Sequence, residues 1–269
     1  PQTTGVGPAV LVYESGSNHQ FALTAAQNLF PTSVTVSASS NFNTLLASQA
    51  WEVVVMDCPG ATPAGGWQPL VDYVNAGGVA VVSFWDWDGG GTILLAPFEL
   101  SATFTFGLVG QNFQDSGTSN VFQGVTMPNS DWHSHWNDDG DEFTPAGTAI
   151  GLGHFANPAT PTMVLGNEGR TIATFVFDES GDTWIADGSA IRLWENMITT
   201  VFEREPVLEV TQLSPGQFMT LEATRLGSGS SVSIVVSSLG PGPTNTPFGP
   251  IDVSSPFRVT PRFPADESG

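Results

Sequence analysis

The sequence predicts an α/β domain with a parallel sheet flanked by helices, followed by a small all-β, sandwich-like domain. Apolar, β-branched runs alternate with segments of helical spacing between residues 9 and 91, which is typical of right-handed βαβ units around a parallel sheet. The run at residues 79–82 is unbroken and follows two glycines, as expected of a strand buried on both faces. Near residue 203 the composition changes to short apolar runs separated by Gly, Ser and Pro, which favours all-β structure.

The expected elements of the first domain follow one another closely. Valine-rich or alternating runs predict strands at residues 9–14, 33–38, 51–57 and 79–82. Apolar residues at helical spacing predict helices at residues 19–30, 41–48 and 67–75. A proline closes the first of these helices and a pair of glycines closes the third.

The regular pattern is lost from residue 92 to about residue 153, where one extended segment at 102–106 stands among loops. A hairpin is expected next, because the turn at residues 166–169 (Gly-Asn-Glu-Gly) separates two apolar runs, 162–165 and 170–177. The last helix of this domain is expected at residues 189–202, where the apolar side chains fall on one face.

The two domains are expected to cover residues 1–203 and 206–269. The second domain has expected strands at 207–212, 218–223 and 231–237. Seven prolines follow residue 240, and they forbid central-strand pairing over much of the closing segment.

The composition is acidic and nearly free of basic residues. The formal net charge is −20, and the six basic residues are all arginines, so lysine is absent. Nucleic acid and anionic membrane surfaces are therefore not expected as partners, since binding phosphates requires clustered Lys and Arg. The single cysteine excludes an intramolecular disulfide, and no stretch reaches the roughly 18 apolar residues of a membrane span. The start at Pro-Gln-Thr-Thr suggests a processed end, and we expect an extracellular or cell-surface location.

Several short motifs of the first domain resemble those of a known superfamily. They are the strand at residues 10–13 followed by His19, the helix-to-strand passage 73–79, the hairpin 169–177 and the helix segment 191–196. Together they resemble the class I glutamine amidotransferase-like superfamily, and within it the trehalose-utilisation (ThuA-like) proteins, over residues 9–203. The resemblance implies a flavodoxin-like α/β fold.

The chain departs from this superfamily at the position of the nucleophile. The resemblance implies a nucleophilic cysteine, or in ThuA-like proteins a histidine, after the strand that here ends at Val82, Ser83 and Phe84. This chain offers only Ser83, Phe84 and Trp85 there. We therefore expect amidotransferase activity to be absent and the domain to be non-catalytic.

The region from Pro206 resembles a small β-domain found at the C-termini of secreted and surface proteins of planctomycete-type bacteria. The residues that carry this resemblance are 227–229 (Gly-Ser-Gly) and 238–249, which is rich in Gly and Pro. Such domains continue with further strands beyond the point where this chain stops. The resemblance therefore implies that one edge of the β-domain is unpaired.

Four side chains are expected near the carboxyl ends of the first, third and fourth strands: Glu14, His19, Asp57 and Asp86. In open α/β sheets this is where ligands bind. A carboxylate beside a histidine could perform acid–base chemistry or hold a divalent metal. The alternative is that these residues cap helices and satisfy loop backbone. Cys58, which precedes a proline, is expected to be a buried and inert thiol.

Two loop segments carry possible metal ligands. Asp138, Asp139, Asp141 and Glu142 concentrate carboxylates that could bind calcium, although the glycine spacing differs from an EF-hand loop. The alternative is a solvated acidic turn. His133 and His135 alternate on an extended segment and could bind a transition metal, whereas His154 is expected to be structural.

Four tryptophans in the loops could form an aromatic platform for sugar rings, or could plug the core. They are Trp85, Trp87, Trp132 and Trp136.

Together these features favour a non-catalytic extracellular or cell-surface structural protein that associates with copies of itself through an open β-edge, with a filament as one form of the assembly. Two alternatives stay open. One is a ThuA-like hydrolase or isomerase acting on sugars, with His19 and either Glu14 or Asp86 as catalytic residues. The other is a carbohydrate-binding module that uses the loop tryptophans.

Overall fold

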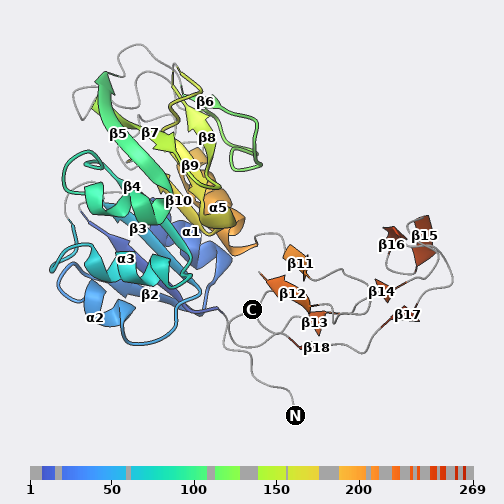
Figure 1. Ribbon diagram of the computed structural model, residues 1–269. Helices are drawn as coiled ribbons and strands as arrows, with labels where there is room; N and C mark the ends of the chain where they lie inside the picture. Colours follow the sequence, from blue (N-terminus) through green and yellow to red (C-terminus); the bar gives the residue numbers. More distant parts are fainter. Residues whose placement is uncertain are drawn as a thin grey trace. The chain divides into compact units, whose positions relative to one another are not determined.

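The chain forms two compact units, Pro1–Phe202 and Glu203–Gly269, and each is described by itself. The computed structural model describes residues 8–15, 20–58, 62–107, 113–127, 139–155, 157–175 and 188–203, with eight short strands between 207 and 264. Figure 1 shows the order of the elements. None of the described helices combines the length and apolar composition that a membrane span requires.

The alternation of strands and helices expected for the start of the chain is confirmed. The elements are β1 (Val10–Glu14), α1 (Phe21–Leu29), β2 (Val34–Ser37), α2 (Phe42–Leu46), β3 (Val53–Cys58), α3 (Gln68–Asn75) and β4 (Ala80–Phe84). Each lies within or close to its predicted range, because valine runs and helical spacing are clear in this part of the sequence.

The second half of this unit is richer in strands than the sequence predicts. Its elements are η1 (Thr92–Leu94), η2 (Ala96–Phe98), β5 (Leu100–Gly107), β6 (Gln114–Asp115), β7 (Asp139–Pro145), β8 (Ile150–His154), β9 (Met163–Gly166), η4 (Asn167–Gly169), β10 (Thr171–Thr174) and α5 (Ser189–Phe202). The hairpin of β9 and β10 and the helix α5 are confirmed, and β5 contains the predicted extended segment.

The prediction that the rest of this region is loop is wrong, since it contains β6, β7 and β8. The sequence pattern does not predict β8, because glycines stand at positions 151 and 153, where most strands have β-branched residues. A Cβ at Gly153 would lie 2.3 Å from the Phe113 ring, and one at Gly151 would lie 2.9 Å from Pro161. Close packing therefore selected glycine over strand-forming residues.

Eight of the described strands of the first unit form a mixed sheet in the order β2-β1-β3-β4-β10-β9-β8-β6. Strands β2, β1, β3, β4 and β10 run parallel, whereas β9, β8 and β6 pair antiparallel. The parallel part has the 2-1-3-4-5 strand order of flavodoxin-like folds. Strands β5 and β7 form a separate antiparallel ladder. The fold is thus flavodoxin-like α/β, with an antiparallel extension that the sequence did not predict.

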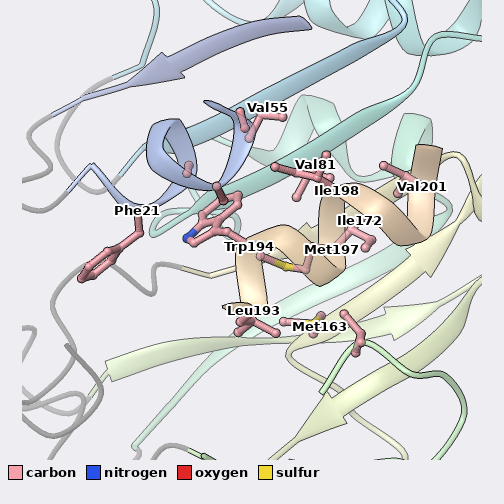
Figure 2. Close-up of a cluster of buried hydrophobic side chains, with 14 of the residues drawn as sticks. Phe21, Val55, Val81, Met163, Ile172, Leu193, Trp194, Met197, Ile198 and Val201 are labelled. Carbon is pink, nitrogen blue, oxygen red and sulfur yellow. The ribbon is translucent and has the colours of Figure 1, made fainter. Parts of the chain in front are cut away.

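Helices α1 and α5 cover one face of the parallel strands. The buried side chains of α5 recur at helical spacing and form one apolar stripe. Figure 2 shows this stripe against the sheet, with Leu193, Trp194, Met197, Ile198 and Val201 facing Val55, Val81, Met163 and Ile172. Burying each such side chain stabilises the fold by about 1.5–3 kcal/mol.

A second core cluster lies on the opposite face of the sheet, with α2, α3, η1 and η2. Its largest fully buried side chains include Trp87, Phe98 and Phe143. The Trp87 ring packs edge-on against both phenylalanines, with ring centroids 5.6 Å and 5.3 Å apart. Residues from the loop after β4 and from β7 are therefore joined through one indole.

The carboxylate of Glu99 connects its own turn to two others, which contain Thr148 and Asn167. Its Oε2 accepts hydrogen bonds from Thr148 N at 3.1 Å, from Thr148 Oγ1 at 2.7 Å and from Asn167 N at 2.8 Å. Glu99 itself has φ +56, a left-handed conformation that is uncommon for a residue with a Cβ. These contacts show why the backbone is held in that conformation.

The described strands of the second unit pair as antiparallel two-stranded ladders. They are β11 (Val207–Thr211) with β12 (Thr220–Thr224), β13 (Ser231–Val232) with β18 (Phe263–Pro264), β14 (Val235–Val236) with β17 (Arg258–Val259), and β15 (Pro243–Thr246) with β16 (Gly249–Asp252). Strands β11 and β12 overlap the first two expected ranges, and β13 and β14 both lie within the third. Three of the seven prolines, Pro243, Pro250 and Pro264, lie on strands of these two-stranded ladders, where an open edge needs no backbone N–H; the other four lie outside the described residues. The sandwich-like arrangement stays a prediction.

Tyr73 fastens α3 to the start of β4. Its hydroxyl lies 3.0 Å from Trp51 O and 3.2 Å from Val79 O, and it accepts the Val79 N–H at 3.1 Å. A Cβ at Gly78 would lie 2.4 Å from the Tyr73 ring, so only glycine fits beneath it. The predicted passage from residue 73 to residue 79 is therefore one packed unit.

We expect Tyr73→Phe to lower the free energy of unfolding by about 1–3 kcal/mol, because the Val79 N–H would lose its acceptor in a nearly buried position. Urea unfolding followed by circular dichroism measures this. Asn75→Ala, at an exposed position on the same helix, is the control and should change stability by less than about 0.5 kcal/mol. Equal effects of the two variants would contradict the assigned role.

Candidate functional site

A row of polar residues crosses the sheet where its parallel strands end. Glu14 of β1 is the register partner of Asp57 of β3, which pairs with Ser83 of β4, which in turn pairs with Thr174 of β10. Each lies two residues beyond a member of the α1/α5 core cluster, so the four side chains belong to that face. The prediction that Glu14 and Asp57 lie at carboxyl ends of strands is confirmed.

Most of this row is closed off from solvent. Asp57, Ser83 and Thr174 are each 0% exposed. Within the described part of the chain, the Ser83 hydroxyl has no hydrogen-bond partner. Glu14 is half-buried, and its Oε1 accepts a hydrogen bond from Leu23 N of α1 at 2.9 Å. The Glu14 carboxylate therefore satisfies helix backbone, which was the alternative considered for these residues.

Cys58 ends β3 on the opposite face, in the cluster that also contains Tyr13. Burial raises the pKa of the Cys58 thiol well above its usual value, and the charges of Asp57 and Glu14 add to this, whereas a hydrogen bond with Ser15 acts the other way. Burial also raises the pKa of Tyr13, against hydrogen bonds with Ser15 and Ser39. The buried position expected for Cys58 is confirmed, and its neutral thiol is a poor nucleophile.

In the loop after β4, a polar side chain forms a hydrogen bond with the backbone of the same loop. Asp86 is half-buried, and its Oδ2 accepts a hydrogen bond from Gly90 N at 2.7 Å. Gly89 and Gly90 leave room for this carboxylate, since a Cβ at either would lie less than 3 Å from it. Asp86 thus stands at the carboxyl end of β4, as predicted, and closes a tight turn there.

Trp87 plugs the end of the sheet. It is 0% exposed, its Nε1 donates to Thr174 O at 2.7 Å, and its backbone N–H donates to Asp141 Oδ2 at 2.9 Å. Trp85 is instead 46% exposed. Of the proposed aromatic platform, only Trp85 is available to a ligand among the described residues, because Trp87 belongs to the core.

The segment after β4, where the resemblance implied a nucleophile, contains neither cysteine nor histidine. Ser83 is buried within β4, Phe84 packs in the core, and Trp85 has no nucleophilic atom. Residues 85–91 are all described, and none of them has a positive φ. A strained elbow that would present a nucleophile is therefore absent from this segment.

The acidic segment considered for calcium is a strand rather than a turn. Asp141 and Glu142 lie in β7, are buried, and pair with Thr105 and Phe104 of β5. The expectation of a solvated turn is wrong for these residues. As neighbours on a strand, their side chains point to opposite faces. Asp138 lies outside the described residues, and Asp139 is described only as part of the β7 backbone.

The described residues contain no group of three or more His, Cys, Asp and Glu side chains placed to hold a metal ion. Because Asp138 is outside that set, calcium binding by Asp138, Asp139, Asp141 and Glu142 stays a prediction.

Other predicted site residues also lie outside the described part of the chain. They are His19, His133, His135, Trp132 and Trp136. His154 is described, and it is a buried residue of β8 whose Nδ1 lies 3.0 Å from Phe155 O. Its burial is as expected of a structural histidine, and that role stays a prediction.

Sequence reasoning missed the link between Trp87 and Asp141 and the position of Ser83 and Thr174 in the polar row. The first joins residues 54 positions apart, and no local pattern reveals such a pair. The second could have been found by aligning the predicted parallel strands in register, which would place Asp57 beside Ser83.

No protein-family model matches this chain, and no curated protein matches it in sequence. Among solved structures, it is similar to a protein from Thermoplasma acidophilum that is described as part of a GMP synthase, with 11% identity and a TM-score of 0.46, covering 70% of this chain and 94% of that one. A protein from Bacteroides uniformis described as ThuA-like has 12% identity and a TM-score of 0.45, covering 76% and 96%. A glutamine amidotransferase from Methylobacillus flagellatus has 10% identity and a TM-score of 0.38, covering 74% and 94%. At these identities no activity, substrate or cofactor carries over to this chain.

We expect Asp141→Ala to destabilise the protein by about 1–3 kcal/mol, because the buried Trp87 N–H would lose its acceptor. Asp141→Asn keeps an oxygen at the same place and should recover a large part of the loss. Thermal unfolding followed by tryptophan fluorescence measures both. Equal destabilisation by the two variants would contradict the contact as the cause.

The thiol of Cys58 should resist labelling at neutral pH in the native protein and react only as the chain unfolds. A pKa raised in the folded state also makes stability depend on pH. Above about pH 8.5, where an unfolded thiol ionises, the unfolded chain binds fewer protons, so the free energy of unfolding falls. Cys58→Ala should reduce this slope. Rapid native labelling, or an unchanged slope in the variant, would contradict the burial of the thiol.

Proposed function

We propose that the chain is a non-catalytic structural protein, extracellular or at the cell surface, that associates with copies of itself through open β-edges and builds filaments. The proposal that the chain is non-catalytic is supported by the side chains at the carboxyl end of β4. Ser83 is buried, Phe84 and Trp87 pack in the core, and the Asp86 carboxylate closes its own turn. These side chains leave the position that would carry a nucleophile without reactive chemistry.

Strand edges that lack a partner among the described strands support the proposal that the chain associates with itself. Strand β2 is one of the two edge strands of the eight-stranded sheet that the described residues form. In the second unit, the described strands pair only two by two, as in the ladder of β11 with β12. Strand edges present backbone N–H and C=O groups that pair readily with another chain. A head-to-tail contact that does not close into a ring generates a filament, and so do two different two-fold contacts on each copy.

The charge of the chain bears on the conditions for assembly. At a net charge of −20, copies repel one another in dilute salt, and salt or divalent cations reduce this repulsion. An exported protein meets such conditions outside the cell. Calcium bound by Asp138, Asp139, Asp141 and Glu142 would act in the same direction.

Carbohydrate binding is a second candidate, supported by the exposed Trp85 at the carboxyl end of β4. A sugar-directed enzyme that uses His19 with Glu14 or Asp86 is supported less, since backbone N–H groups already engage both carboxylates. Titration with polysaccharides while tryptophan fluorescence is recorded tests the first of these. Loss of the signal in Trp85→Ala would support carbohydrate binding.

We expect the purified full chain to associate as its concentration or the salt concentration rises. Light scattering coupled to size exclusion measures the mass, and negative-stain microscopy separates filaments from small oligomers. Added calcium should increase the mass and a chelator should reverse this, if the acidic segment binds the ion. A monomer at every concentration, with and without calcium, would contradict the proposed function.

A further inference from the structure

The longest segment of the chain without a charged side chain forms one edge of the sheet. Residues 15–51 contain no Asp, Glu, Lys or Arg, although the whole chain has 26 acidic residues. This segment supplies α1, β2 and α2. A strongly acidic protein thus has an uncharged region at the β2 edge of its larger unit.

Among the described strands, β2 pairs on one side only. It is a terminal strand of the sheet, and β1 is its single neighbour there. The Val10 N–H donates to Ser33 O at 3.1 Å, and the register pairs Val10 with Val34. Since peptide groups alternate along a strand, Thr35 faces β1, and the N–H and C=O groups of Val34 and Val36 face away from it.

The side chains of β2 leave this edge unprotected. Val36 is 53% exposed, the largest value among the exposed large apolar side chains of the described residues. The strand, Val-Thr-Val-Ser, carries no charge, no proline and no bulge, which are the features that usually block pairing at an edge. The edge is therefore open in both its backbone and its side chains.

Charge also favours a second copy as the occupant of this edge. Two chains of net charge −20 repel wherever their acidic surfaces meet, and the β2 edge avoids that contact. Asn28 of α1 donates to Glu195 at 2.8 Å, but Arg192 lies 3.0 Å from the same carboxylate group and balances its charge. The charge of Glu195, which contacts α1, is therefore partly offset.

We propose that β2 pairs antiparallel with β2 of a second copy about a two-fold axis, so that two sheets become one continuous sheet. This deepens the proposed self-association by naming its interface, and it depends on that proposal. With the axis at Thr35, Val34 lies opposite Val36 of the second copy, and each such pair exchanges two backbone hydrogen bonds. The exposed Val36 is then covered by a valine of the other chain.

A charge-reversal test separates this interface from others. Val36→Asp places like charges beside the two-fold axis and should raise the dissociation constant of the dimer by about tenfold or more. Val36→Thr keeps the shape and the β-propensity, and should change it by less than about threefold. Ile93→Asp, at a 45% exposed position of η1, adds the same charge elsewhere and serves as the matched control. Sedimentation equilibrium measures the constants, and circular dichroism checks the fold.

Hydrogen exchange gives a second readout that needs no variant. The Val34 and Val36 amides face the open edge, so they should exchange quickly in dilute protein and slowly when the chain associates. A wild-type chain that is monomeric under all conditions overturns both this interface and the proposed function. A wild-type chain that associates, with Val36→Asp equal to Ile93→Asp and with unprotected β2 amides, overturns only the β2 interface.

Discussion

Trp87 is fully buried where β4 ends, and two hydrogen bonds fix it between separate parts of the first unit. Its indole N–H binds Thr174 O at the end of β10, and its backbone N–H binds the carboxylate of Asp141 in β7. The ring also packs against Phe98 and Phe143. The parallel sheet, the loop after β4 and the β5–β7 ladder therefore meet at this residue, and the carboxyl edge of the sheet cannot open without losing it.

This closure determines what the end of the sheet can do. In open α/β folds the carboxyl ends of the strands are the usual place for ligands, and here polar residues do lie there. Yet Asp57 and Ser83 are covered, Glu14 binds the backbone of α1, and Asp86 binds its own turn. The described polar groups of this edge therefore contact the protein's own backbone and core.

The sequence predicted those elements whose formation depends on residues close together along the chain. Valine runs predicted β1, β3 and β4 well, because a strand covered on both faces needs an unbroken apolar run. The strand β8 was missed, because packing against Phe113 requires glycine at Gly153. The acidic strand β7 was read as a turn, since only its long-range partner, Trp87, explains a buried Asp141. The polar row depends on register between strands, which a pattern along one strand cannot supply.

The two edge strands of the eight-stranded sheet differ in length and charge. At one end lies β2, an uncharged valine strand, and at the other lies β6, only two residues long and ending in the exposed Asp115. Short length and an acid both discourage pairing, so β6 is the less favourable of the two described edges for adding a strand. If β2 alone pairs with a second copy, the sheet is extended by one partner and no further. In that case a longer polymer would need a second contact, made by the other unit, to join one β2-paired dimer to the next. The two units of the chain would then have different roles in assembly.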